Sequence, residues 1–158
     1  MLHPFAPVFN EQSRVLILGS FPSVRSREIG FYYGHPQNRF WYVLAQIFEE
    51  SAVPSTTQER LEFVFRHGVA LWDSIHSCEI TGSSDSSIRN VRPNDIASLL
   101  TQTGITKVYC NGRKAYDLYG RFCEEKTGVS AVLLPSTSAA NASWSLERLA
   151  EAWQIIRT

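Results

Sequence analysis

The sequence predicts a three-layer α/β/α sandwich around a central, mostly parallel sheet of about four strands. Short apolar and β-branched runs recur along the chain, and each leads into Gly, Asn, Asp, Ser or Pro. Such runs are typical of strands that are buried on both faces. Segments with helical spacing separate the runs, and this order requires crossover connections between parallel strands. The strands are expected at residues 14–19, 68–72, 105–110 and 129–134.

Three segments outside the expected strands carry clear helix signals. In segment 39–48 the large apolar residues lie on one face at helical spacing. Thr56 and Glu59 have the spacing of a capping box, which predicts a helix start at that point. Segment 146–156 repeats the apolar spacing and predicts the last helix. Because no repeat, linker or low-complexity stretch divides the chain, residues 1–158 are expected to form a single domain.

Composition and charge exclude several classes of protein. The chain has 158 residues, of which 44% are apolar and 19% charged, and this fits one domain with its own core. Fifteen basic residues balance fifteen acidic ones, so net charge indicates neither a polybasic nucleic-acid binder nor an acidic tail. The amino terminus lacks a secretion signal and no apolar run reaches about 18 residues, which predicts a cytoplasmic protein without a membrane span.

The cysteines give no sign of a cofactor. Cys78, Cys110 and Cys123 are widely spaced, without a CxxC pair and without a histidine at a zinc-like interval. This pattern predicts neither a disulfide framework nor a metal site. We therefore expect reduced thiols, no metal and no cofactor.

The expected sheet also predicts where a ligand would bind. In an open parallel sheet the binding crevice lies beyond the carboxyl ends of the strands. This rule selects four loops, at residues 19–38, 73–90, 111–114 and 135–143. Aromatic residues are dense in segment 31–41, beside glycine and proline, which favours a rigid pocket wall. An ordinary apolar cluster beneath a long loop is the alternative.

Five segments at these strand ends carry a family resemblance. They read GSFPS at 19–23, YYGHPQNRFW at 32–41, LWD at 71–73, YCNG at 109–112 and LPSTSAANA at 134–142. Together they resemble the uracil-DNA glycosylase superfamily, and most of all its hypoxanthine-DNA (deoxyinosine) glycosylase branch. The matching segments follow the family's order from about residue 13 to residue 153.

The resemblance implies a monomeric DNA repair enzyme that hydrolyses the N-glycosidic bond of a deaminated base, hypoxanthine above all, after rotating it out of the DNA. Uracil or xanthine as the base, and a non-catalytic nucleotide- or damaged-DNA-binding domain, are the alternatives. The chain cannot supply the four-cysteine cluster of the iron–sulfur branches. A monofunctional enzyme is expected, because Lys114 is the only lysine in the motif loops and a Schiff-base lysine needs burial or a cationic neighbour.

The resemblance assigns the catalytic role to Asn38. Related mismatch-specific enzymes place the attacking water with an asparagine in the first motif, where this chain has Phe21. In the hypoxanthine branch the asparagine of the His-Pro-x-Asn segment takes this role, and it corresponds to Asn38. A carboxamide can orient water through its oxygen or donate to the base through its nitrogen. A helix cap is the alternative role of Asn38, and His35 is either an acid for the departing base or a structural residue.

Four residues are candidates for contacting the base. Hypoxanthine presents N1–H as a donor and O6 as an acceptor, and Asn111 can match both, with a simple Asn-Gly turn as the alternative. Tyr33 stands where related enzymes stack an aromatic ring on the base, with pocket structure as the alternative. Asp73 can accept from N1–H or cap the next loop. Phe21 of the first motif completes the set.

Hydroxyl groups are expected to bind DNA phosphates without adding net charge. Ser136, Thr137 and Ser138 have short side chains that allow close backbone approach, and Ser20 and Ser23 offer the same from the first motif. A plain turn before the last helix is the alternative for the first three.

Overall fold

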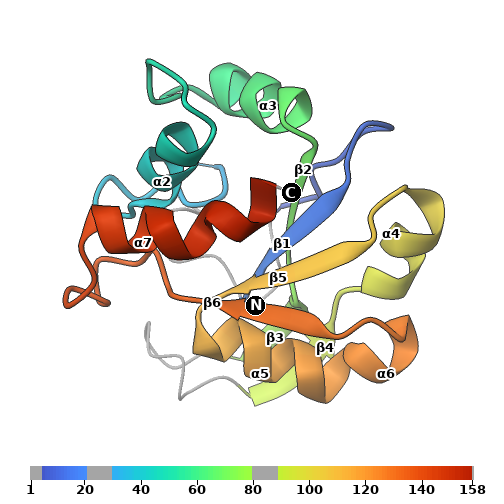
Figure 1. Cartoon of the computed structure of the whole chain (residues 1–158). Coiled ribbons are helices and arrows are strands. Elements are labelled where there is room, and N and C mark those ends of the chain that lie inside the picture. Colours follow the sequence, from blue (N-terminus) through green and yellow to red (C-terminus); the bar gives the residue numbers. More distant parts are fainter. Residues whose placement is uncertain (1–4, 21–29, 80–88, 158) are drawn as a thin grey trace.

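Four parallel strands form the central sheet of this protein (Figure 1). The computed structural model describes residues 5–20, 30–79 and 89–157. The sheet contains β1 (Val15–Gly19), β2 (Val69–Asp73), β5 (Lys107–Asn111) and β6 (Ala131–Leu134), in the order β2-β1-β5-β6. The predicted fold class is confirmed, and each strand lies within two residues of its expected start and end. Helices cover both faces of the sheet, so its strands need no polar face and can consist of continuous apolar runs.

Helices form the two outer layers. One face of the sheet carries α2 (Phe40–Ile47), α3 (Thr57–Arg66), α7 (Leu146–Trp153) and the 3₁₀ turn η2 (Gln154–Arg157) (Figure 1). The other face carries α4 (Ile96–Gln102), α5 (Arg113–Phe122) and α6 (Glu124–Thr127).

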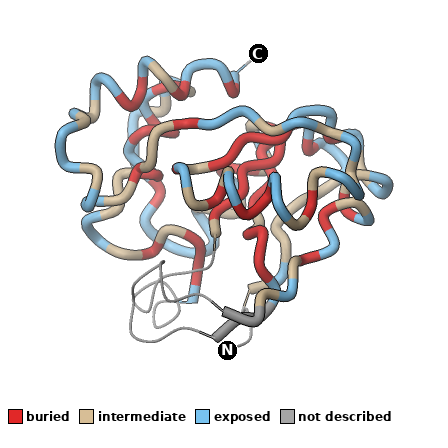
Figure 2. The backbone as a smooth tube through the Cα atoms, turned by 90° about the horizontal axis from the view of Figure 1, so that it is seen from below, coloured by how far each residue is buried: buried red, intermediate tan, exposed pale blue. Residues whose placement is uncertain are grey.

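Alternation along the strands divides the core between the two faces. Ile17 of β1 packs toward α2 and α7, whereas its neighbours Leu16 and Leu18 pack toward α4 and α5. All three are fully buried, and Figure 2 shows much of the buried backbone, in red, at the centre of the molecule. The sheet therefore forms a rigid base for the loops at its carboxyl edge.

The expected helix starts are close to the observed ones. Helix α2 begins at Phe40, one residue after the expected start. Thr56 accepts from the Glu59 backbone N–H at 3.1 Å, and the Glu59 carboxylate accepts from the Thr56 N–H at 3.1 Å. The predicted capping box is thus complete and begins helix α3.

One pair of strands was not predicted. β3 (Ile75–Glu79) lies within the expected loop 73–90 and pairs antiparallel with β4 (Arg89–Pro93), which begins in that loop and extends beyond it. Their sequences, IHSCE and RNVRP, are mostly polar and lack clear apolar alternation, so they carry no strand signal. The register also shifts twice along the pair, as at a β-bulge.

The segment before β1 supports the aromatic loop. Val8 forms an isolated antiparallel bridge with Leu71 of β2. The Tyr32 hydroxyl donates to the Ala6 carbonyl at 2.9 Å, and the Phe5 ring packs at 4.9 Å from the Tyr32 ring. These contacts tie the loop that follows Gly30 to the sheet.

Within the described part of the chain, no helix has both the length and the apolar character needed to cross a bilayer. The same residues contain no cluster of three or more side chains suited to holding a metal ion.

The central strand should be the most sensitive part of the fold. We expect Ile17→Ala to lower the free energy of unfolding by about 2–5 kcal/mol, because it leaves a cavity in the packed layer under α2 and α7. Val53→Ala, at a side chain 36% exposed, is the matched control and should change it by less than about 0.5 kcal/mol. Urea unfolding followed by circular dichroism measures both, and equal effects would contradict this description of the core.

Candidate active site

The carboxyl ends of the four parallel strands bring the candidate residues together. Gly19 lies in register with Asp73, and Asn111 lies in register with Leu134, after which the loop 135–144 begins. The segment 30–39 reaches the same edge, because the backbone N–H of Arg39 donates to the carbonyl of Thr137 at 3.0 Å. Phe21 and Ser23, two of the predicted site residues, lie outside the described residues.

A single threonine joins the two candidate carboxamides. The Thr137 hydroxyl donates to Oδ1 of Asn38 at 2.8 Å, and Nδ2 of Asn111 donates to the same hydroxyl oxygen at 3.0 Å. The backbone N–H of Thr137 also donates to Oδ1 of Asn111 at 3.1 Å. Three segments far apart in the sequence thus meet in one hydrogen-bonded cluster.

The Asn38 side chain is oriented by two donors. Its Oδ1 accepts from the backbone N–H of Phe40 at 2.9 Å as well as from Thr137. The bond to Phe40 spans two residues, as in an Asx turn, and lies just before helix α2. The N-cap of α2 is Arg39, without a side-chain capping bond, so Asn38 shapes the entry to the helix and is not its cap. Because an amide oxygen has two lone pairs, both are used, and Asn38 has its two N–H groups left to offer a ligand.

Asn111 keeps one donor and one acceptor for a ligand. One N–H and one lone pair are used by Thr137, which leaves the second N–H and the second lone pair. The Gly112 residue that follows has φ of 93°, a conformation that favours glycine, and it is the N-cap of α5. The Asn-Gly turn is therefore real, and it does not use the polar atoms of the Asn111 side chain.

Tyr33 has an unusual backbone and an unusual hydroxyl. Its φ is 54°, in the left-handed region that bulky residues rarely adopt, which indicates that its position is imposed by the surroundings. Its ring stacks on Phe40, with centroids 4.0 Å apart and planes 12° from parallel, so only the other face can receive a base. Among the described residues its buried hydroxyl has no hydrogen-bond partner.

The surroundings of Tyr33 keep its hydroxyl protonated. Burial, and then the charge of Asp73, raise the pKa of Tyr33 well above its usual value. Tyr33 can therefore donate a hydrogen bond throughout the neutral pH range.

Asp73 lies at the end of β2, and only 3% of its surface is exposed. A Cβ atom added at Gly19 would collide with Asp73 Oδ1 and come within 3.1 Å of the Tyr33 hydroxyl, so glycine is needed for this close approach. The Asn94 side chain donates to the Asp73 carbonyl at 2.7 Å and fixes the backbone there. The structure thus places Asp73 beside Tyr33 at the edge that also holds Asn111.

The loop 135–144 differs from expectation at one of its three candidates. Thr137 was expected to bind phosphate, but its exposed fraction is 0% and its hydroxyl, N–H and carbonyl all have partners inside the protein. Ser136 and Ser138 are half-buried, and each hydroxyl accepts one backbone N–H. Each of these serines keeps its own O–H available as a donor, as phosphate binding requires.

His35 has a structural contact. Its Nδ1 accepts from the backbone N–H of Gln37 at 3.1 Å, and its carbonyl accepts from the N–H of Asn38 at 2.9 Å. Both bonds shape the turn that presents Asn38. This supports the structural alternative for His35.

Arg39 is a residue that the sequence reading did not single out. Its guanidinium donates to the carbonyls of Ser138 and Asn141 at 3.0 Å each, and also to the carbonyl of Trp144. The indole N–H of Trp153 binds the start of the same loop, at the Pro135 carbonyl, at 2.9 Å. These two side chains hold the loop against α2 and α7. The partners of Arg39 lie about a hundred positions further along the chain, so no local pattern could have indicated them.

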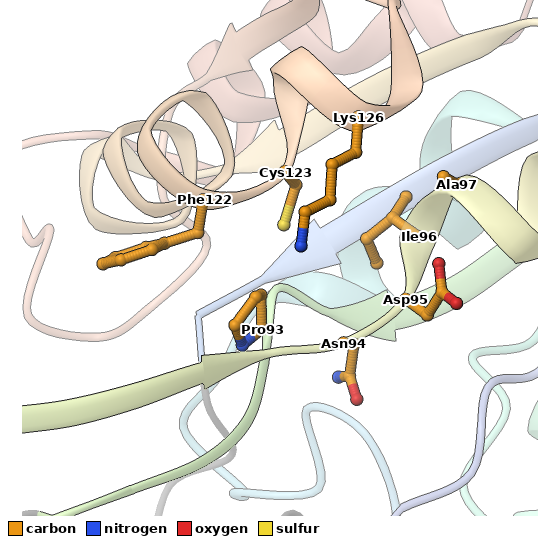
Figure 3. Close-up of a pocket in the computed structure, with 8 residues that line it drawn as sticks. All are labelled: Pro93, Asn94, Asp95, Ile96, Ala97, Phe122, Cys123 and Lys126. Carbon is orange, nitrogen blue, oxygen red and sulfur yellow. The ribbon is translucent and has the colours of Figure 1, made fainter.

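A pocket of about 260 Å³ lies elsewhere, between the start of α4 and the helices α5 and α6 (Figure 3). None of the predicted site residues lines it. Burial raises the pKa of its Cys123 thiol to about 11, so this cysteine is not a thiolate nucleophile at neutral pH. Of its lining residues, Asn94 is the one linked to the site, through its bond to Asp73.

Replacing the Arg39 guanidinium should loosen the loop 135–144. We expect Arg39→Lys to lower the free energy of unfolding by about 1–3 kcal/mol, because an ammonium group cannot reach three carbonyls in the same geometry. Hydrogen exchange followed by mass spectrometry should show faster exchange at residues 138–144. Arg113→Lys, at a side chain 72% exposed, is the matched control. Unchanged exchange in the loop would contradict the role assigned to Arg39.

Two curated proteins are similar to this chain over most of its length. A hypoxanthine DNA glycosylase of Methanosarcina acetivorans is 31% identical over 153 residues, which cover 96% of this chain and 95% of the relative. A hypoxanthine DNA glycosylase of Methanosarcina barkeri is 34% identical over 140 residues, 87% of this chain and 86% of the relative.

A solved structure and a family comparison also match nearly the whole chain. A solution NMR structure of a Methanosarcina acetivorans protein, described as a uracil DNA glycosylase, aligns with a TM-score of 0.84 and 31% identity, over 99% of this chain and 98% of that one. The sequence matches the Uracil DNA glycosylase superfamily over residues 6–157. The chain therefore belongs to the uracil DNA glycosylase superfamily.

Proposed function

We propose that this protein is a monofunctional DNA glycosylase that removes hypoxanthine from deoxyinosine in DNA. Family membership and the names of the two Methanosarcina relatives support this proposal. The observation that carries it is the pair of carboxamides, Asn38 and Asn111, held by Thr137 at the carboxyl edge of the sheet. We also propose that it acts as a monomer in the cytoplasm.

The free groups of Asn111 fit the edge of hypoxanthine. The remaining N–H donates to O6 of the base, and the remaining lone pair of Oδ1 accepts from N1–H. Adenine presents the reverse pattern, an amino donor at C6 and an acceptor at N1, so it would meet like groups. Asn111 therefore distinguishes the deaminated base from the normal one. The face of the Tyr33 ring that does not stack on Phe40 is proposed to receive the base, and such stacking contributes on the order of 1–3 kcal/mol per base.

Asn38 is proposed to hold the attacking water. As the bond between C1′ and the base breaks, its electron pair leaves with the base and positive charge develops on the sugar. An N–H of Asn38 donates to one lone pair of the water oxygen, and the other lone pair attacks C1′. The attacking water gives one proton to bulk water as the new C–O bond forms, and the departing base anion takes one proton from bulk water, so the protons balance. No lysine takes part, so the product is an intact abasic site.

Contact with DNA is proposed to come from hydroxyl groups. Ser136 and Ser138 of the loop 135–144 and the half-buried Ser20 at the end of β1 can each donate an O–H to a phosphate. Because neutral donors release few counterions, binding should depend only modestly on salt.

Base release from synthetic duplexes tests the proposal directly. Single-turnover assays on DNA with one inosine, uracil or xanthine should show fastest release from inosine. We expect Asn38→Ala to slow that release by at least about 100-fold, because the water is no longer held. Asn10→Ala is the matched control, since Asn10 orders a turn before β1, at the opposite edge of the sheet, through Gln12 and Ser13.

The other outcomes separate the alternatives. Faster release of uracil or xanthine would change the substrate and leave the enzyme class in place. If the wild type binds the duplexes but releases no base from any of them, the non-catalytic alternative is correct and the proposed function is wrong.

A second substitution separates two uses of the Asn38 amide. In Asn38→Asp one carboxylate oxygen can keep the bonds to Phe40 and Thr137, and the other takes the place of the NH₂ group. That oxygen can still hold water and accept its proton, so we expect markedly faster inosine cleavage than in Asn38→Ala. If the single-turnover rate of inosine cleavage falls equally in both variants, the result would instead indicate that Asn38 donates to the departing base.

A further inference from the structure

We propose that Thr137 is the positioning residue of this site, and that its hydroxyl sets the orientation of both Asn38 and Asn111. This inference deepens the proposed function and rests on it. It starts from the complete burial of Thr137 in a loop where the neighbouring candidates, Ser136 and Ser138, are partly exposed. A residue expected to face DNA instead faces the protein.

The hydrogen-bond directions in this cluster are forced, starting from two backbone groups. The Thr137 N–H can only donate, so the Asn111 atom beside it must be the amide oxygen, and the other Asn111 atom must be the NH₂ group. That NH₂ group donates to the Thr137 hydroxyl oxygen. Because the hydroxyl oxygen accepts from Asn111, the hydroxyl hydrogen donates to Asn38.

The second backbone group fixes the other end. The Phe40 N–H can only donate, so the Asn38 atom at 2.9 Å must be its amide oxygen. This is the same atom that receives the Thr137 hydroxyl hydrogen at 2.8 Å. The two backbone donors therefore require the same set of hydrogen-bond directions. Rotating either amide group by 180° would break two hydrogen bonds.

The arrangement decides what each amide offers a ligand. Asn38 presents donors only, and Asn111 presents one donor and one acceptor. Without the hydroxyl, each amide would keep a single backbone bond, and its free groups would lose their fixed direction. Thr137 therefore links base recognition with water placement without touching the substrate.

Two variants of Thr137 test the proposal. Thr137→Val keeps the shape and removes the hydroxyl, and Thr137→Ser keeps the hydroxyl and removes the methyl group. In single-turnover cleavage of inosine DNA we expect Thr137→Val to be about 10- to 100-fold slower than wild type, as for a small misplacement of catalytic groups. Thr137→Ser should stay within about threefold of wild type.

Binding separates positioning from a general structural role. Affinity for a duplex with a stable abasic-site analogue should stay within about twofold of wild type for both variants, because Thr137 does not face the DNA. Loss of affinity together with activity in Thr137→Val would mean that the loop 135–144 has been disrupted, and it would overturn the proposal. So would a Thr137→Val variant with wild-type cleavage, or a Thr137→Ser variant as slow as Thr137→Val.

A spectroscopic measurement tests the same bonds without activity. In NMR spectra the side-chain NH₂ of Asn111 should be protected from solvent exchange in the wild type and in Thr137→Ser, and should lose that protection in Thr137→Val. If the wild type releases no base, the proposed function fails, and this measurement still decides whether Thr137 orients Asn111. Equal exchange in all three proteins would overturn the positioning role. Should Thr137→Val fail to fold, Thr137→Ser with slow cleavage or an unprotected Asn111 NH₂ would overturn it too.

Discussion

Satisfying two backbone N–H groups, those of Phe40 and Thr137, is the constraint on which this site depends. A buried N–H needs an acceptor, and each of these finds an asparagine oxygen. The same bonds that stabilise the helix start and the loop therefore orient the two amides. For Asn38, a structural turn and the proposed function are not competing roles, because the bond from Phe40 fixes which atoms the amide presents. The local stability of the fold and the proposed chemistry of the site thus depend on the same hydrogen bonds.

Much of the fold could be predicted from the sequence, because it rests on short-range signals. A run such as residues 15–18 has no polar position and needs cover on both faces, which leads to a parallel sheet with two helical layers. The capping box of Thr56 acts over three residues and could be located without a structure. The pair β3 and β4 could not, because polar strands are held by main-chain pairing rather than by an apolar pattern.

The candidate site was predictable only as a set of positions. Strand ends and the family resemblance placed Asn38, Asn111 and Tyr33 at one edge of the sheet, and the described structure brings them together. The burial of Thr137 was not predictable, because a Pro-Ser-Thr-Ser segment has the same letters whether its threonine faces solvent or the protein. The roles of the site residues still depend on the proposed function.

Arg39 binds carbonyl groups within the protein, and this helps to explain how a chain with zero net charge could bind a polyanion such as DNA. Its guanidinium is half-buried beside the loop 135–144, and both terminal nitrogens donate to carbonyls of that loop, while Nε is buried. Arg39 is therefore not placed to bind a phosphate. It holds the loop in place, and within the loop the Ser136 and Ser138 oxygens are positioned by the backbone N–H groups that they accept from. A preorganised loop loses little conformational entropy when it binds a ligand. Neutral donors on such a loop can therefore suffice for binding, whereas a mobile loop would need additional charge to offset its entropy loss. The cation thus contributes by ordering the loop, and the amides and hydroxyls that it orders are the groups proposed to meet the DNA.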